Sequence, residues 1–169
     1  MTDSELRQAF EQHQDAVYRF AWRMTASPEA AEDIAQEVFL ALVRRPDSYD
    51  PERGPLRAFL LGAARNQACK RFRDQPRWDV LEEEDLVFLP TANVDVAEAV
   101  AAAVQALPPL QREALILAEY EDLSLEEIAR AVEAEIGTVK ARLHRARENL
   151  RKALAPFYET NPRTVEHGR

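Results

Sequence analysis

Residues 137–152 read GTVKARLHRARENLRK, and they concentrate positive charge in a chain whose formal net charge is -8. The stretch holds six basic side chains against one acidic side chain. At the period of an α-helix, one face of it carries Val139, Leu143, Ala146 and Leu150, and the basic side chains lie off that face. The spacing therefore predicts a helix that packs an apolar face on a core and presents a basic face to solvent.

A second amphipathic stretch lies immediately upstream, at residues 124–132. There the Ser124 hydroxyl can cap a helix and Glu127, three residues later, can return the hydrogen bond, which is a capping box. Two short helices joined by a tight turn, the second of them basic, are typical of a helix-turn-helix. A solvated basic helix in an all-helical bundle is the other interpretation, but the combination of features favours nucleic-acid binding.

Charge is segregated along the chain. Residues 55–73 contain five basic and no acidic side chains, and residues 135–155 contain six basic and two acidic ones. Residues 75–134 contain three basic and fourteen acidic side chains. The sequence therefore predicts two basic surfaces separated by an acidic middle.

The composition favours helix, with 46% hydrophobic and 31% charged residues and only four glycines among 169 residues. Turn-forming residues crowd positions 45–55, and residues 75–95 have the character of a linker. Helical patterns are expected at residues 3–26, from a Ser27 cap and Pro28 onward, and at residues 56–73, 96–107 and 111–120.

Several classes of function find no support in the sequence. The single cysteine, Cys69, excludes an intramolecular disulfide, and His13, His144 and His167 lack the spacing of metal ligands. The chain carries no nucleophile triad and no phosphate-cradling glycine loop, so we expect no catalytic residues, metal or cofactor. It has no apolar run long enough to span a bilayer and no leader pattern, so we expect a cytoplasmic protein without membrane insertion.

Two blocks of motifs define a resemblance. The first block comprises AEDIAQEVF at 31–39, YDP at 49–51, RG at 53–54 and ARN at 64–66. The second comprises LPP at 107–109, QRE at 111–113, LS and EEIA within 123–129, and GTVK and RLHRAR within 137–147. With both blocks in this order and spacing, the chain resembles the extracytoplasmic-function (ECF) class of bacterial RNA polymerase sigma factors over roughly residues 10–155.

The resemblance implies an all-α fold of two small helical domains joined by a flexible linker. Residues 1–74 would form a sigma region 2-like domain, 75–96 an acidic linker, 97–155 a region 4-like domain with the helix-turn-helix, and 156–169 a tail. It also implies binding to core RNA polymerase, through the beta-prime clamp and the beta flap, and promoter-specific initiation at minus-ten and minus-thirty-five elements. An anti-sigma factor is a further partner implied by resemblance.

Residue roles follow from the same resemblance. The polymerase-binding positions are Asp33, Gln36 and Glu37, although spacing alone favours an ordinary solvated face there. The resemblance assigns melting and recognition of the minus-ten element to the loop at 47–54 and to five residues of the helix that follows: Arg57, Arg65, Asn66, Arg71 and Arg73. The positions facing the minus-thirty-five element are Lys140, Ala141, His144 and Arg145, with Arg112, Arg142 and Arg147 expected to grip the DNA backbone.

Aromatic residues and departures from the family pattern add further expectations. Tyr49 or Phe59 can stack on a base, although core packing is the favoured interpretation. Glu133 stands where the turn of the helix-turn-helix usually carries glycine, so we expect a reshaped loop, and with Glu135 it should weaken nonspecific DNA binding. Ala141, Phe59 and Lys70 replace a usual serine, tryptophan and aspartate.

Two alternatives remain open from the sequence. A stand-alone helix-turn-helix regulator that binds DNA as a dimer accounts for residues 97–155 but leaves the first block of motifs without a role. A sigma-like adaptor that has lost promoter recognition is consistent with the acidic middle and with Glu133.

Overall fold

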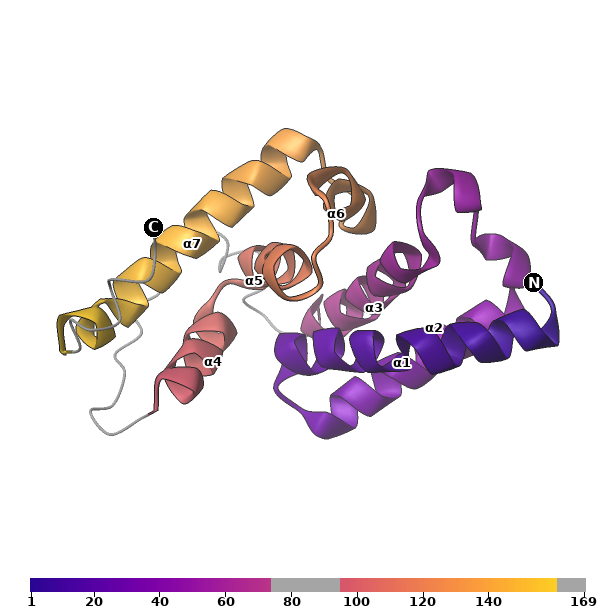
Figure 1. The fold of residues 1–169 in the computed structure, drawn as a ribbon, viewed down its shortest axis with the longest axis horizontal. Coiled ribbons are helices and arrows are strands. Elements are labelled where there is room, and N and C mark those ends of the chain that lie inside the picture. The colour runs from indigo at the N-terminus through magenta and orange to yellow at the C-terminus, as the bar shows by residue number, and fades with distance from the viewer. Residues whose placement is uncertain (74–94, 161–169) are drawn as a thin grey trace.

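The computed structural model describes residues 1–73 and 95–160 of the chain (Figure 1). These residues form helices and short helical turns without a strand, which confirms the all-α prediction for this part of the chain. Residues 74–94, which include most of the expected linker at 75–96, and the tail residues 161–169 lie outside the described residues. We refer to residues 1–73 as the N-terminal half and to residues 95–160 as the C-terminal half.

The N-terminal half is a bundle of α1 (Asp3–Thr25), α2 (Pro28–Arg44) and α3 (Leu56–Arg73). The first helix begins at a capping box between Thr2 and Glu5, with donor–acceptor distances of 2.6 and 3.2 Å. The second begins as the sequence predicts, because the Ser27 hydroxyl accepts a 3.1 Å hydrogen bond from the amide of Ala30 and Pro28 takes the first helical position. The buried faces meet in a core that includes Phe20, Met24, Ile34, Leu60 and Leu61.

The loop between α2 and α3 contains two short 3-10 turns, η1 (Pro46–Ser48) and η2 (Pro51–Arg53). The Tyr49 hydroxyl donates a 3.0 Å hydrogen bond to the carbonyl oxygen of Gly54, which closes the loop on itself. The rings of Tyr49 and Phe59 lie 5.5 Å apart between centroids, and both pack against the core. The structure thus gives both aromatic side chains the packing role that the sequence favours.

The C-terminal half contains α4 (Val96–Ala106), α5 (Pro109–Leu115), the π-helical η4 (Ile116–Tyr120), α6 (Leu125–Ala131) and α7 (Ile136–Thr160). The predicted capping box is present, since Ser124 and Glu127 exchange two 3.1 Å hydrogen bonds at the start of α6. The predicted apolar face of α7 is also present: Val139, Leu143 and Ala146 are buried and Leu150 packs against the core. Helix α7 continues through Pro156 to Thr160, so the first residues of the expected tail are helical.

The two halves pack directly against each other, α3 on α6 and α1 on α4, α5 and η4 (Figure 1). The closest approach is between α3 and α6, where a Cβ atom built on Gly62 would lie 3.3 Å from the Cα of Ala131. Buried apolar residues from both halves join in one hydrophobic cluster. The sequence predicts two domains on a linker, and it does not predict this contact.

The turn between α6 and α7 contains Glu133, the residue that stands where glycine is usual. Glu133 adopts φ 53°, the left-handed conformation that a glycine would take at this position. The amide of Ala134 still donates a 3.0 Å hydrogen bond to the carbonyl of Ala129, so the turn is closed. Glu133 therefore takes the left-handed backbone conformation in place of a glycine, at a steric cost that a glycine would not have.

This conformation generates a prediction about stability. We expect Glu133→Gly to be more stable than Glu133→Ala by roughly 1 kcal/mol, because only glycine occupies a left-handed position without steric strain. Urea denaturation followed by circular dichroism measures the difference. Equal stability of the two variants would show that the turn stores no strain at residue 133.

Candidate nucleic-acid and polymerase interfaces

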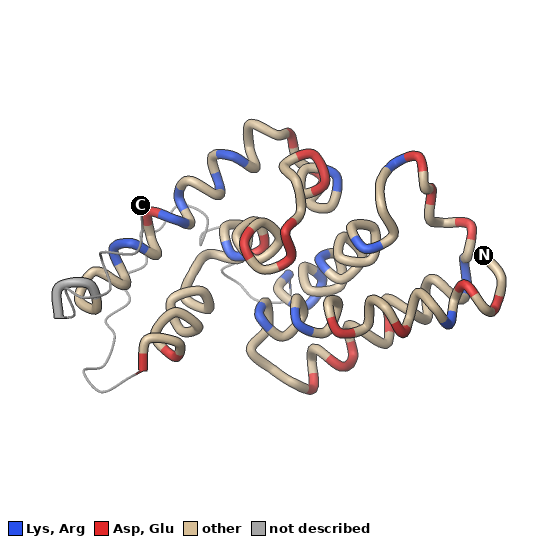
Figure 2. Tube along the Cα trace, in the orientation of Figure 1, with Lys and Arg blue, Asp and Glu red and all other residues tan. Residues whose placement is uncertain are grey.

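Helix α7 presents an exposed stripe on the side opposite its buried face. Lys140, Ala141, His144 and Arg145 are all exposed, and their spacing keeps them on one side of the helix. Figure 2 shows Lys and Arg positions recurring along this helix, with acidic positions clustered on the neighbouring segment that leads into α6. The structure therefore brings the four predicted minus-thirty-five residues together on the second helix of the helix-turn-helix.

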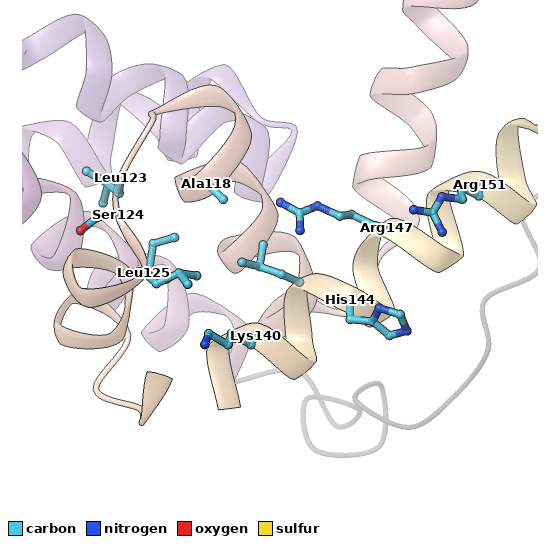
Figure 3. A pocket seen from close by; sticks show the side chains of 10 residues that line it. Ala118, Leu123, Ser124, Leu125, Lys140, His144, Arg147 and Arg151 are labelled. Carbon is cyan, nitrogen blue, oxygen red and sulfur yellow. The ribbon is translucent and has the colours of Figure 1, made fainter. Parts of the chain in front are cut away.

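A groove runs between α7 and the segment that leads into α6 (Figure 3). Lys140, His144 and Arg147 line it from α7, and Leu123 and Leu125 line it from the other side. The Arg147 guanidinium forms an exposed ion pair at 2.7 Å with Glu119, which lies in η4. Such an exposed pair is weak and leaves Arg147 able to exchange its partner for a phosphate.

Arg112 is not on the exposed face. Its side chain is buried, and its guanidinium donates hydrogen bonds of 2.5, 2.7 and 2.9 Å to the carbonyl oxygens of Met24, Gln105 and Leu107. Burial lowers the pKa of Arg112 to about 10, so the group stays protonated at neutral pH. In this arrangement Arg112 holds the end of α1 against the C-terminal half and cannot reach a DNA phosphate.

Arg142 is also turned inward, since it is half-buried and its charge acts on the buried carboxylate of Glu113. The two residues expected from the sequence to grip the DNA backbone beside Arg147 therefore face the protein interior. The exposed residues Arg145 and Arg147 remain as candidates on α7.

Two predicted minus-ten residues on α3 form ion pairs with the C-terminal half. Arg57 donates hydrogen bonds of 2.5 Å to both the carbonyl oxygen and the Oε2 atom of Glu121. Arg65 holds both oxygens of Glu113, at 2.7 Å through Nε and 3.0 Å through its terminal nitrogen. Both carboxylates are fully buried.

The electrostatics of the Glu113 site reflect this burial. Burial raises the pKa of Glu113, although Arg65 and Arg142 oppose the change. Burial also acts against the charged form of Arg65, but the hydrogen bond and charge of Glu113 raise the pKa of Arg65 overall. Beside them, burial and then the charge of Glu113 raise the pKa of the Cys69 thiol to about 11, so this thiol is unreactive at neutral pH.

The other minus-ten candidates remain nearer to solvent. Asn66 is exposed and lies at a cleft that α3 and the preceding loop form with α6. Arg71 forms an exposed 3.2 Å ion pair with Asp33 of α2, and Arg73 is exposed at the end of α3. The five residues share one helix; Asn66, Arg71 and Arg73 are exposed, whereas the side chains of Arg57 and Arg65 are 34% and 14% exposed.

The predicted polymerase-binding residues form one exposed face of α2. Asp33, Gln36 and Glu37 are exposed, and the same side of the helix continues to Leu40, which is 43% exposed, with Val43 nearby at 57%. Sequence reasoning missed these two apolar residues. The available signal was that both fall outside the apolar repeat of Ile34, Val38 and Leu42 that forms the buried face.

Arginine residues that sequence reasoning missed surround Glu121. Arg19 and Arg23 of α1 lie 3.6 and 3.9 Å from its carboxylate oxygens, and the Arg23 guanidinium lies 4.1 Å from the ring centre of Tyr120. No local sequence pattern identifies such contacts. Among the described residues, no group of three or more His, Cys, Asp or Glu side chains is placed to hold a metal ion, and no described helix could cross a membrane.

Comparisons with known proteins agree with this arrangement of two helical regions. Residues 9–77 match the family described as Sigma-70 region 2, and residues 97–150 match Sigma-70, region 4. The ECF RNA polymerase sigma factor SigW of Bacillus subtilis is 31% identical over 159 residues, which cover 84% of this chain and 84% of SigW. This chain therefore belongs to the ECF class of RNA polymerase sigma factors.

Further relatives support the fold. The ECF RNA polymerase sigma factor SigE of Mycolicibacterium smegmatis is 34% identical over 154 residues, covering 85% of this chain but only 59% of SigE. The co-crystal structure of the sigma factor RpoE with the anti-sigma factor NepR from Bartonella quintana matches with a TM-score of 0.71 and 26% identity, over 89% of this chain and 97% of that chain. The structure of CnrH in complex with the cytosolic domain of CnrY shares the fold, with a TM-score of 0.69 and 24% identity over 92% of this chain and 90% of that chain.

The contacts of Arg112 generate a prediction. We expect Arg112→Ala to destabilise the protein by at least about 2 kcal/mol, because it leaves buried carbonyl oxygens without donors. Arg147→Ala, which removes an exposed ion pair, should change stability by no more than about 0.5 kcal/mol. Urea denaturation measures the free energy of unfolding of both variants. An equal loss of stability in the two variants would contradict the structural role of Arg112.

Proposed function

We propose that this protein is a promoter-specificity subunit that binds core RNA polymerase and directs initiation at promoters with minus-ten and minus-thirty-five elements. The observation that carries the proposal is the exposed stripe of α7, because it places Lys140, His144 and Arg145 on the second helix of a helix-turn-helix. The protein acts where polymerase and DNA are, in the cytoplasm. It binds and opens DNA, and it catalyses no bond chemistry.

For the minus-thirty-five element, α7 enters the major groove. Lys140 and Arg145 donate hydrogen bonds to guanine edges or phosphates, and His144 can do either. Ala141 offers a small apolar contact, which suits a thymine methyl group. Arg147 would contact a phosphate of the DNA backbone after its ion pair with Glu119 breaks. Arg112 and Arg142 are not part of this DNA-binding set, because Arg112 is buried and Arg142 is half-buried near Glu113.

For the minus-ten element, α3 supplies the cationic surface that holds an unstacked strand. Arg57, Arg65, Arg71 and Arg73 would contact phosphates, and Asn66 can read a base edge. Two of these arginines are paired with the C-terminal half in the structure. Binding through the whole of α3 therefore requires the two halves to separate.

For polymerase, the face of α2 with Asp33, Gln36 and Glu37 would dock on the beta-prime clamp, with the C-terminal half on the beta flap. Exposed Leu40 and Val43 strengthen this assignment, because apolar groups beside a polar face are a common feature of interfaces. RpoE and CnrH occur in the matched structures with a second protein, NepR and CnrY. We propose an anti-sigma factor as a partner here too.

One observation favours the adaptor alternative, a sigma-like protein without promoter recognition. Arg57 and Arg65 are both occupied by carboxylates of the same chain. Transcription in vitro with purified core polymerase separates the candidates, because an adaptor supports no promoter opening and a stand-alone regulator binds DNA without polymerase.

The polymerase-binding face can be tested by substitution. We expect replacement of Asp33, Gln36 and Glu37 by Ala to abolish binding to core polymerase, and Leu40→Ala to weaken it, with stability changed by no more than about 1 kcal/mol. The matched control replaces Glu11, Gln12 and Asp15, which are exposed on α1 and have the same side-chain chemistry. Co-purification with core polymerase is the readout. Normal binding by the folded triple variant would remove this assignment.

The recognition stripe can be tested on promoter variants. Lys140→Ala and Arg145→Ala should each weaken promoter binding by the holoenzyme roughly ten- to a hundredfold and relax the preference at one base pair, since a base contact is worth about 1–3 kcal/mol. Arg147→Ala should weaken binding evenly and reduce the salt dependence. Neutral residues at Glu133 and Glu135 should raise general affinity by removing repulsion of the DNA backbone.

The measurement is a set of affinities over single-base promoter variants at two salt concentrations. If Lys140→Ala and Arg145→Ala change neither affinity nor base preference, α7 does not read the promoter and the adaptor becomes the better account.

A further inference from the structure

Helix α7 forms one side of the groove in Figure 3, and basic residues recur along that side. Four of them follow one another at intervals of four, three and four positions: Lys140, His144, Arg147 and Arg151. This spacing keeps all four on one face of the helix. Among the described residues that line the groove, none is acidic. In a chain whose net charge is -8, such a basic side is a local attraction for an anion.

The apolar residues of the groove are already covered by the protein itself. Leu123, Ile128 and Leu143 are buried, and Ala118 and Leu125 are half-buried. An apolar peptide would gain little by binding here, because such a complex is stabilised by covering exposed apolar area. The exposed surface of the groove is provided mainly by the basic side chains of α7. The groove therefore fits an occupant with a row of negative charges, which describes a DNA backbone.

The basic side continues beyond the residues that are proposed to contact the minus-thirty-five element. Arg151 follows Lys140 by eleven residues, which is roughly 16 Å along an α-helix. The major groove of B-DNA is about 12 Å wide. A helix with Lys140 at the base edges is therefore longer than the groove is wide. In the homeodomain, a related motif, the C-terminal end of the recognition helix contacts the DNA backbone.

We propose that Arg151 binds a phosphate at the edge of the minus-thirty-five element, where the DNA backbone lies along the basic side of this groove. The inference rests on the proposed DNA-binding role of α7, and it extends the contact surface about one turn beyond Arg147. The planar guanidinium group of Arg151 is suited to a phosphate, which it can bind through two parallel hydrogen bonds. The contact adds affinity without reading sequence, because every base pair has the same phosphates.

Arg151 is available for this contact in the structure. Its side chain is 71% exposed and pairs with Glu148, three residues earlier, whose side chain is 41% exposed. An exposed pair of this kind contributes little to stability, so a phosphate can take the place of the carboxylate. Glu148 shares a face of α7 with Ala141 and Arg145, which are proposed to face DNA. Its negative charge opposes DNA binding there, and Arg151 is the cation that offsets it.

The salt dependence of promoter binding tests the contact. We expect Arg151→Ala to weaken promoter binding by the holoenzyme roughly threefold to tenfold at physiological salt, because one phosphate contact and its counterion release are lost. The slope of log affinity against log salt should become shallower by about 0.9. The preference among single-base promoter variants should stay as in the wild type. Arg151→Lys should restore most of the affinity, since an ammonium group also binds phosphate.

The matched control is Lys152→Ala. Lys152 is the next residue of α7, is exposed and does not line the groove, and its removal changes the net charge by the same amount. We expect the control to keep nearly the wild-type salt slope. Equal effects of Arg151→Ala and Lys152→Ala on affinity and slope would show a general effect of charge and overturn the inference. An unchanged affinity and slope in Arg151→Ala would overturn it as well.

Ethylation interference locates the phosphate. Ethylation of a phosphate that the holoenzyme contacts reduces binding, and we expect one such phosphate beside the minus-thirty-five element to lose its effect in Arg151→Ala and to keep it in Lys152→Ala. The same interference pattern in Arg151→Ala and the wild type would contradict the contact.

The variant Lys140→Ala separates this inference from the proposed function. If Lys140→Ala weakens promoter binding and Arg151→Ala does not, only the Arg151 contact is wrong and α7 keeps its proposed role. If Lys140→Ala, Arg145→Ala and Arg151→Ala all bind the promoter as the wild type does, the proposed role of α7 is wrong and the inference fails with it.

Discussion

The structure depends on two fully buried carboxylates that are neutralised across the boundary between the halves. Glu113 and Glu121 lie in the C-terminal half, and Arg57 and Arg65 of α3 hold them. Because a buried carboxylate needs a cation or many hydrogen-bond donors, this requirement specifies where the C-terminal half can sit on α3. Apolar packing between the halves adds contact area, but it has no comparable directional preference.

A local irregularity of the backbone helps to place Glu121. After α5 the chain widens into the π-helical η4, whose last hydrogen bond runs from the amide of Glu121 to the carbonyl of Ile116, at 3.1 Å. Asp122 then takes a left-handed φ of 55°, which ends the helix. A π-turn advances the chain by an extra residue and so changes which side chains face inward, and such turns are often found at functional positions.

The distribution of charge matters more here than the net charge of -8. A sigma factor must bind DNA, and here the net negative charge of the chain repels the DNA backbone. Binding therefore depends on two local basic surfaces. Acidic side chains of the C-terminal half lie beside both surfaces, with Glu119 on Arg147 of α7 and Glu113 on Arg65 of α3. The exposed pair is easily exchanged, whereas the buried one separates only when the halves move apart.

The sequence by itself determined the helical fold, the starts of α2 and α6, the buried face of α7 and membership of the sigma family, because helical periodicity, capping and motifs act over a few neighbouring residues. It gave no sign that Arg112 is buried against backbone carbonyls or that Arg57 and Arg65 are paired with carboxylates. Those facts depend on contacts between residues 48 to 88 positions apart. Only the tertiary structure decided them, because the path of the chain between the halves sets which charges meet, and no local pattern carries that information.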